Sequence, residues 1–171
     1  MIMADARDFF SRAKTGLSRA GAYTRATNGP ERDQGYIRFI LTLVFNIYLF
    51  RHPSVPSPVL WVAGTYNFYS TVMLVSTFIQ PGKSILRRVS GLTLDTIIIC
   101  YCMYLSGKAG SPLVLVLFWN MFGYSFRYGK YYLFYGMALC IVFFGAVVLK
   151  TPYWVENKEM GYGLLAGVVL I

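Results

Sequence analysis

The chain has 171 residues, of which 56% are hydrophobic and 13% charged, whereas soluble domains carry about 25% charged residues. This composition is typical of a membrane protein, and an aromatic content of 18% excludes a disordered chain. The formal net charge of +9 is compatible with two kinds of partner, anionic lipid and nucleic acid. The distribution of the charges along the chain distinguishes between them.

Residues 1–35 are polar and basic, and they lack the apolar stretch of a cleaved signal peptide. Phe9, Phe10 and Leu17 fall near one face of a helix, with Arg12 beside them. This pattern is typical of a short helix that lies on an anionic membrane surface. A disordered basic tail is the alternative, because several glycines interrupt the segment.

From Tyr36 onward, apolar runs alternate with short loops that carry proline, glycine or charge. We predict an all-α membrane protein, a polytopic bundle of six transmembrane helices, with five as the alternative. A crossing needs about 20 residues, so the shorter runs must extend into flanking interfacial side chains. The last run is about half a crossing long, and we expect a longer polypeptide to follow it. The predicted spans are 36–50, 59–79, 91–106, 112–126, 131–149 and 161–171.

The positive charges indicate how this bundle lies in the membrane. If the N-terminus is cytoplasmic, twelve Lys and Arg residues lie inside and four lie outside. The positive-inside rule favours this arrangement, so we expect a multi-pass protein of the bacterial inner membrane with segment 1–35 in the cytoplasm. The charge then reflects topology and contact with anionic lipid, and no nucleic acid partner is expected.

Asp95 is the only acidic residue inside an apolar run. An intramembrane carboxylate is by default paired or functional. Arg87 and Arg88 lie two helical turns earlier on the same side, and Arg127 enters the same cytoplasmic end from the next hairpin. Of these candidates we expect Arg127 to be the partner, because the six-span topology brings both residues to the cytoplasmic end of the bundle. The pair could simply fix helix packing, or it could be part of a ligand-gated or proton-linked switch.

Amides inside the spans are a second group of candidates. They usually form hydrogen bonds between neighbouring helices. The alternative is a headgroup-binding pocket bounded by Asn67, Trp119 and Asn120, since ligand sites combine an apolar wall with a few polar groups.

The segment from Gly163 to Gly167 is a G-x-x-x-G motif, which allows close approach of another helix. We expect a homodimer through this helix, with packing inside one subunit as the alternative. No catalytic constellation is present, and the single histidine, His52, lies far from the three cysteines. We therefore expect a non-enzymatic chain without a metal or cofactor.

A series of short motifs runs through the membrane region in a fixed order. Together these motifs resemble the RpfC-type hybrid sensor histidine kinases, which are quorum sensors for diffusible signal factors. Tyr124 and Ser125 depart from the family pattern, which usually has a Gly-Asn-Gly step here, and the bulk of Tyr124 could reshape a pocket. The motifs are Arg87-Arg88-x-x-Gly91-x-x-x-Asp95, Met103-x-x-x-Gly107, Ser111-Pro112-Leu113, Trp119, Gly123, Arg127-Tyr128-Gly129, Pro152-Tyr153-Trp154 and Gly163-Leu164-Leu165-x-Gly167.

The resemblance implies a sensory input module that detects a fatty-acid-like quorum signal and transmits it to a cytoplasmic kinase absent from this chain. A fatty-acid carboxylate would be read by Arg88 or Arg127 at the cytoplasmic end, and by Asn67 or Asn120 nearer the middle. The family is described with five spans and an external N-terminal segment, which the charge count opposes. The alternative function is a non-catalytic accessory subunit of a larger respiratory or photosynthetic membrane complex.

Overall fold

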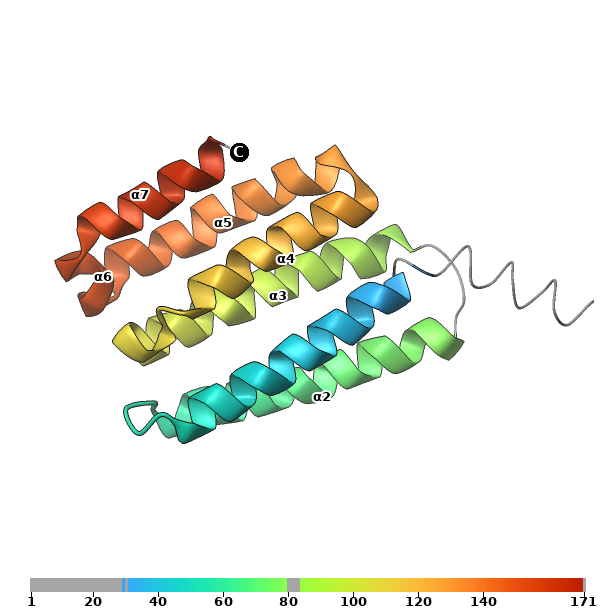
Figure 1. Cartoon of the computed structure of the whole chain (residues 1–171), viewed down its shortest axis with the longest axis horizontal. Coiled ribbons are helices and arrows are strands. Elements are labelled where there is room, and N and C mark those ends of the chain that lie inside the picture. Colours follow the sequence, from blue (N-terminus) through green and yellow to red (C-terminus); the bar gives the residue numbers. More distant parts are fainter. Residues whose placement is uncertain (1–28, 30, 80–83, 171) are drawn as a thin grey trace, which may run out of the picture.

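The computed structural model of this chain describes residue 29, residues 31–79 and residues 84–170, and within them helix is the only regular secondary structure. The long helices lie side by side, with α2 at one edge and α7 at the other (Figure 1). In chain order the elements are the first helix (residues 31–51), α2 (Ser57–Ile79), α3 (Ile85–Ser106), the 3-10 turn η1 (Gly107–Gly110), α4 (Leu113–Tyr128), α5 (Lys130–Lys150), α6 (Pro152–Glu156) and α7 (Lys158–Val169).

Each predicted span overlaps one of these helices, and the ends differ most at the starts of the first helix and of α3. The all-α prediction is confirmed for the described residues. Two segments, Ile85–Gly110 and Lys130–Lys150, are long and apolar enough to cross a membrane. Crossing by the other helices, and the choice between six and five spans, stay predictions.

The helices extend into polar sequence where side chains satisfy their ends. The span predicted to start at residue 91 begins at Ile85, because the Ser84 side chain accepts a hydrogen bond from the Arg87 backbone N–H at 3.3 Å. Such an N-cap satisfies one of the free donors at a helix start. The surface helix predicted in the N-terminal segment lies outside the described residues, except that residues 31–35 belong to the first helix.

Two glycines with positive φ set the turns of the bundle. Gly107, at φ 52°, ends α3, and Gly129, at φ 95°, is the single residue between α4 and α5. Only glycine adopts such backbone angles without steric cost. The result is a tight α4–α5 hairpin that continues through α6 into α7.

The core of the bundle is apolar and contains all three cysteines, each of them buried. Phe144 and Trp154 pack edge to face with ring centroids 5.4 Å apart, which anchors the short α6 against α5. Close packing continues at Gly161, where an added Cβ would lie 2.7 Å from the Val148 Cγ1. α7 therefore approaches α5 through a glycine.

Candidate functional site

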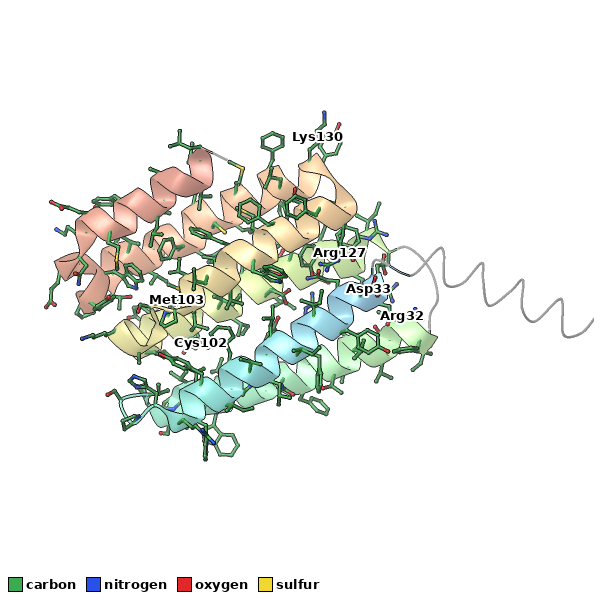
Figure 2. The ribbon with its side chains drawn as sticks, in the orientation of Figure 1. Arg32, Asp33, Cys102, Met103, Arg127 and Lys130 are labelled. Carbon is green, nitrogen blue, oxygen red and sulfur yellow. The ribbon has the colours of Figure 1, made fainter. Side chains whose placement is uncertain are left out.

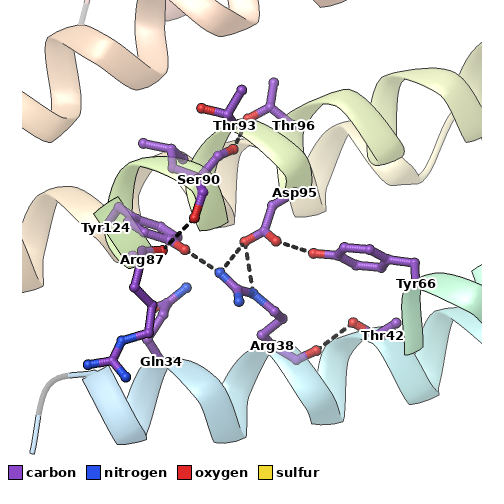
Figure 3. Close-up of polar contacts among 12 residues, drawn as sticks. Gln34, Arg38, Thr42, Tyr66, Arg87, Ser90, Thr93, Asp95, Thr96 and Tyr124 are labelled. Carbon is purple, nitrogen blue, oxygen red and sulfur yellow. Dashed lines mark hydrogen bonds and ion pairs between the residues drawn. The ribbon is translucent and has the colours of Figure 1, made fainter. Parts of the chain in front are cut away.

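A buried polar cluster joins four helices, the first helix, α2, α3 and α4 (Figure 3). Its centre is an ion pair between Arg38 of the first helix and Asp95 of α3. Arg38 Nε donates to Asp95 Oδ2 at 3.1 Å, and Nη2 lies 3.0 Å from the same oxygen. The two side chains are 7% and 4% exposed, so both charges are almost fully removed from solvent.

Two tyrosines complete the coordination of this pair. Tyr66 of α2 donates its hydroxyl hydrogen to Asp95 Oδ1, and Arg38 Nη2 donates to the hydroxyl oxygen of Tyr124 on α4. Gly91, one helical turn before Asp95, makes room for the cluster, because a Cβ there would lie 2.5 Å from both Arg38 Nη2 and the Tyr124 hydroxyl. We call Arg38, Asp95, Tyr66 and Tyr124 the polar cluster.

The intact ion pair and the loss of one of its partners have very different effects on stability. A buried ion pair contributes little net stability, because the desolvation of two charges offsets their attraction. Loss of one partner, however, leaves the other charge buried without compensation. A change in the charge of Arg38 or Asp95 is therefore expected to affect the packing of the four helices that the cluster joins.

A cavity of about 70 Å³ adjoins the polar cluster. Most of its wall is apolar and comes from the first helix, α2, α3 and α4. The apolar lining includes Leu41, Phe45, Leu49, Ile98, Leu113 and Trp119, and the polar lining consists of Gln34, Arg38, Thr42, Asn46, Tyr66, Asp95 and Asn120 with the thiol of Cys102.

The two asparagines of the cavity differ in how their amide nitrogens are satisfied. Asn46 Nδ2 donates to the backbone oxygens of Thr42 and Ala63, at 2.9 and 3.2 Å. Asn120 Nδ2 is buried and has no hydrogen-bond partner among the described residues. A buried amide donor without a partner is costly, so Asn120 is a candidate to donate to a bound molecule.

A second charged cluster lies where the first helix and α3 begin. The Glu31 carboxylate lies 2.6 Å from Arg87 Nη2 and 2.7 Å from Arg88 Nη2, and it also accepts from the Ser84 backbone N–H at 3.2 Å. The Arg88 guanidinium lies 4.5 Å from the ring centroid of Tyr128, within the range of a cation–π contact. This cluster ties the start of the first helix to the start of α3.

The structure corrects the predicted partner of Asp95, which is Arg38 rather than Arg127. Arg127 Nη1 donates instead to Gln34 Oε1 and to the Gly123 backbone oxygen. Figure 2 shows Arg127 at the same end of the bundle as Arg32 and Asp33. The physical reason is that Tyr124, one turn before Arg127 on α4, already occupies the space beside the ion pair.

The other predicted site residues divide into two groups. Trp119 and Asn120 line the cavity, as the pocket hypothesis requires, although their role in binding stays a prediction. Asn67 and Arg127 do not belong to its lining, and Arg88 binds Glu31 instead.

Sequence reasoning missed Arg38, Tyr66 and Tyr124 as members of one site. Arg38 lies inside the predicted span 36–50, close to its start, where flanking interfacial side chains are expected. The rule that intramembrane charges are paired applies to Arg38 as it does to Asp95, and it was the available signal.

The glycines of the G-x-x-x-G motif have open surroundings in the single chain. A Cβ added at Gly163 or Gly167 would meet no atom within 4 Å among the described residues, in contrast to Gly161. Among the described residues, the glycine of α7 with close contacts inside the chain is thus Gly161.

Comparison with known proteins gives one relationship. The chain is 31% identical over 146 residues to the sensory/regulatory protein RpfC from two strains of Xanthomonas campestris pv. campestris. The match covers 82% of this chain and 20% of each relative, so the chain spans about a fifth of the length of the curated relatives it matches. No protein-family model and no solved structure matches the chain. The identity supports an RpfC-like relationship for most of the chain.

Proposed function

We propose that this chain is the membrane-embedded sensory input module of a two-component sensor histidine kinase, which detects a fatty-acid-like quorum signal and passes it to a cytoplasmic kinase. The observation that carries the proposal is the 31% identity to a sensory/regulatory protein over most of this chain. The proposed module is not itself an enzyme.

The proposed setting is the bacterial inner membrane, with six spans and a cytoplasmic N-terminus. Two helices long and apolar enough to cross a membrane support it, as does the excess of positive charge on one side of the predicted topology. Large apolar side chains also cover the outside of the bundle, where Phe126, Phe50 and Trp61 are 85%, 79% and 79% exposed. An outer surface with so many large apolar side chains supports contact with lipid tails.

The proposed ligand site is the cavity between the first helix, α2, α3 and α4. An apolar wall suits an acyl chain, because burial of each methylene contributes about 0.8 kcal/mol. The volume of about 70 Å³ is less than half of the roughly 150 Å³ that accommodates benzene, so a fatty acid must part the helices to enter. Binding would therefore be coupled to a change in helix packing, which a sensor requires.

A chimera tests the proposed function. This chain replaces the matching region of the Xanthomonas relative, and autophosphorylation is measured in vesicles with and without a medium-chain monounsaturated fatty acid. We expect the fatty acid to change the rate at least about fivefold, the lower range of allosteric coupling. Ala63→Leu, which fills the cavity, should abolish the response, whereas the outward-facing Ala146→Leu should preserve it.

An unresponsive chimera that folds and inserts would contradict the sensory function. Stoichiometric purification of this chain with unrelated integral membrane subunits would instead support the accessory-subunit alternative.

We also propose that the module is a homodimer formed through α7. Gly163→Leu combined with Gly167→Leu is expected to lower the dimer fraction about tenfold without a change in the unfolding midpoint, because both positions face open space in one chain. Energy transfer between donor- and acceptor-labelled chains in vesicles measures the dimer. Gly161→Ala is the matched control, and it should lower the midpoint because of contact with Val148. Unchanged energy transfer in the double variant would rule out this interface.

A further inference from the structure

The polar cluster contains a guanidinium group, that of Arg38, which is able to bind the headgroup of an acidic ligand. The Arg38 guanidinium lines the cavity and binds one carboxylate, that of Asp95. Guanidinium groups bind carboxylates in the same planar, charge-assisted geometry whether these belong to a side chain or to a ligand. A carboxylate that enters the cavity would therefore meet Asp95 as a direct competitor.

A second donor lies close to this position along α4. Asn120 and Tyr124 are four residues apart and so share one face of the helix. Tyr124 accepts a hydrogen bond from Arg38, and Asn120 lines the cavity with its amide nitrogen unpartnered among the described residues. The face that contacts Arg38 thus also offers an unused donor one turn away.

The apolar wall continues from this end along the first helix. Leu41, Phe45 and Leu49 follow Arg38 on one stripe of that helix, and all of them line the cavity. From Arg38 to Leu49 the helix rises about 16 Å, the length of an extended chain of roughly a dozen carbons. Trp119 forms part of the wall and is 55% exposed, so the cavity borders the outer surface of the bundle at α4.

We propose that Arg38 and Asn120 bind the carboxylate of a single-chain fatty acid, which takes Arg38 from Asp95 while its tail lies along the first helix toward Leu49. This proposal rests on the proposed function and assigns the headgroup site within it. The exchange is balanced, because a fatty acid that enters in its neutral form transfers its acidic proton to Asp95. Asp95 then remains as a neutral acid beside Tyr66, and the ligand carboxylate takes its place as the counter-ion of Arg38.

The test measures binding of 11-bromoundecanoate and of its methyl ester to the chain in lipid nanodiscs. Bromine quenches nearby tryptophan fluorescence, and Trp61→Phe removes a tryptophan that is 79% exposed. We expect saturable quenching of Trp119 by the acid, and affinity for the ester at least about tenfold weaker, as loss of a charge-assisted hydrogen bond predicts. Trp119→Phe should abolish the saturable component.

Two substitutions should act in opposite directions. Asp95→Asn removes the competitor and is expected to tighten binding of the acid about tenfold. Asn120→Leu removes the second donor and should weaken it about threefold to tenfold, whereas Asn67→Leu, outside the cavity, should not change it. If Asp95 had only a structural role, its replacement would weaken binding.

The outcomes separate this inference from the proposed function. Absence of saturable quenching by either probe would overturn both. Saturable binding with equal affinity for acid and ester would overturn the headgroup assignment and leave the cavity as the ligand site. If Asp95→Asn does not fold, the comparison of acid and ester in the unsubstituted chain still tests the headgroup assignment. The double variant Arg38→Gln with Asp95→Asn should lose the preference for the acid.

Discussion

Asp95→Asn and Arg38→Gln should each lower the free energy of unfolding by about 3–5 kcal/mol, whereas the double variant should lose much less than the sum. Each single change leaves a buried charge without its counter-ion, because both side chains are less than a tenth exposed. The double change leaves two neutral amides, which can form a hydrogen bond to each other. The unfolding free energy would be measured by denaturant titration in mixed micelles.

The control for this cycle is the pair that the sequence predicted. Asp95→Asn and Arg127→Gln should have effects that add to within about 0.5 kcal/mol, because Arg127 binds Gln34 and the Gly123 backbone instead of Asp95. Simple additivity in the Arg38 cycle, or strong coupling in the Arg127 cycle, would show that the partner of Asp95 has been wrongly identified.

Glu31→Gln is expected to lower the free energy of unfolding by about 2–3 kcal/mol. Its carboxylate accepts charge-assisted contacts from Arg87 and Arg88 and a hydrogen bond from the Ser84 N–H, and one such contact contributes about 1.5–3 kcal/mol. The effect should shrink at high salt, because both arginine side chains are partly exposed. The same titration, repeated at two ionic strengths, provides the measurement.

Asp33→Asn is the matched control, since Asp33 is exposed and its replacement changes the net charge by the same amount. Its effect should stay within about 0.5 kcal/mol. Equal effects of the two substitutions would mean that net charge, rather than the contacts of Glu31, determines stability at this end of the bundle.

The positions of the helices could be predicted because hydropathy and turn residues act locally. The apolar run 131–149 and its flanking charges define α5 almost to the residue. Polar helix ends were harder, because α3 begins at Ile85, six residues before the predicted span, through the Ser84 cap and the contacts of Arg87. Whether each helix crosses a membrane depends also on the surrounding lipid, which the arrangement of the helices does not specify.

The candidate site could be predicted in part. Asp95 was identifiable from its chemistry alone, since a carboxylate in an apolar run requires a partner. The identity of that partner was not identifiable, because it depends on which helices are neighbours, and 57 residues separate Arg38 from Asp95. Trp119 and Asn120 line the cavity and Asn67 does not, because no local pattern determines which face of α2 points inward. Whether any of the three binds a ligand stays a prediction.

The separation of Arg38 from Asp95 also has a consequence for biogenesis. At a synthesis rate of about 5–20 residues per second, the ribosome would complete Arg38 some 3–11 s before Asp95. Under the proposed topology, the first helix would enter the bilayer with an arginine whose counter-ion does not yet exist. The insertion machinery or lipid phosphates would have to hold this helix near the interface, and its final docking would wait until α3 emerged.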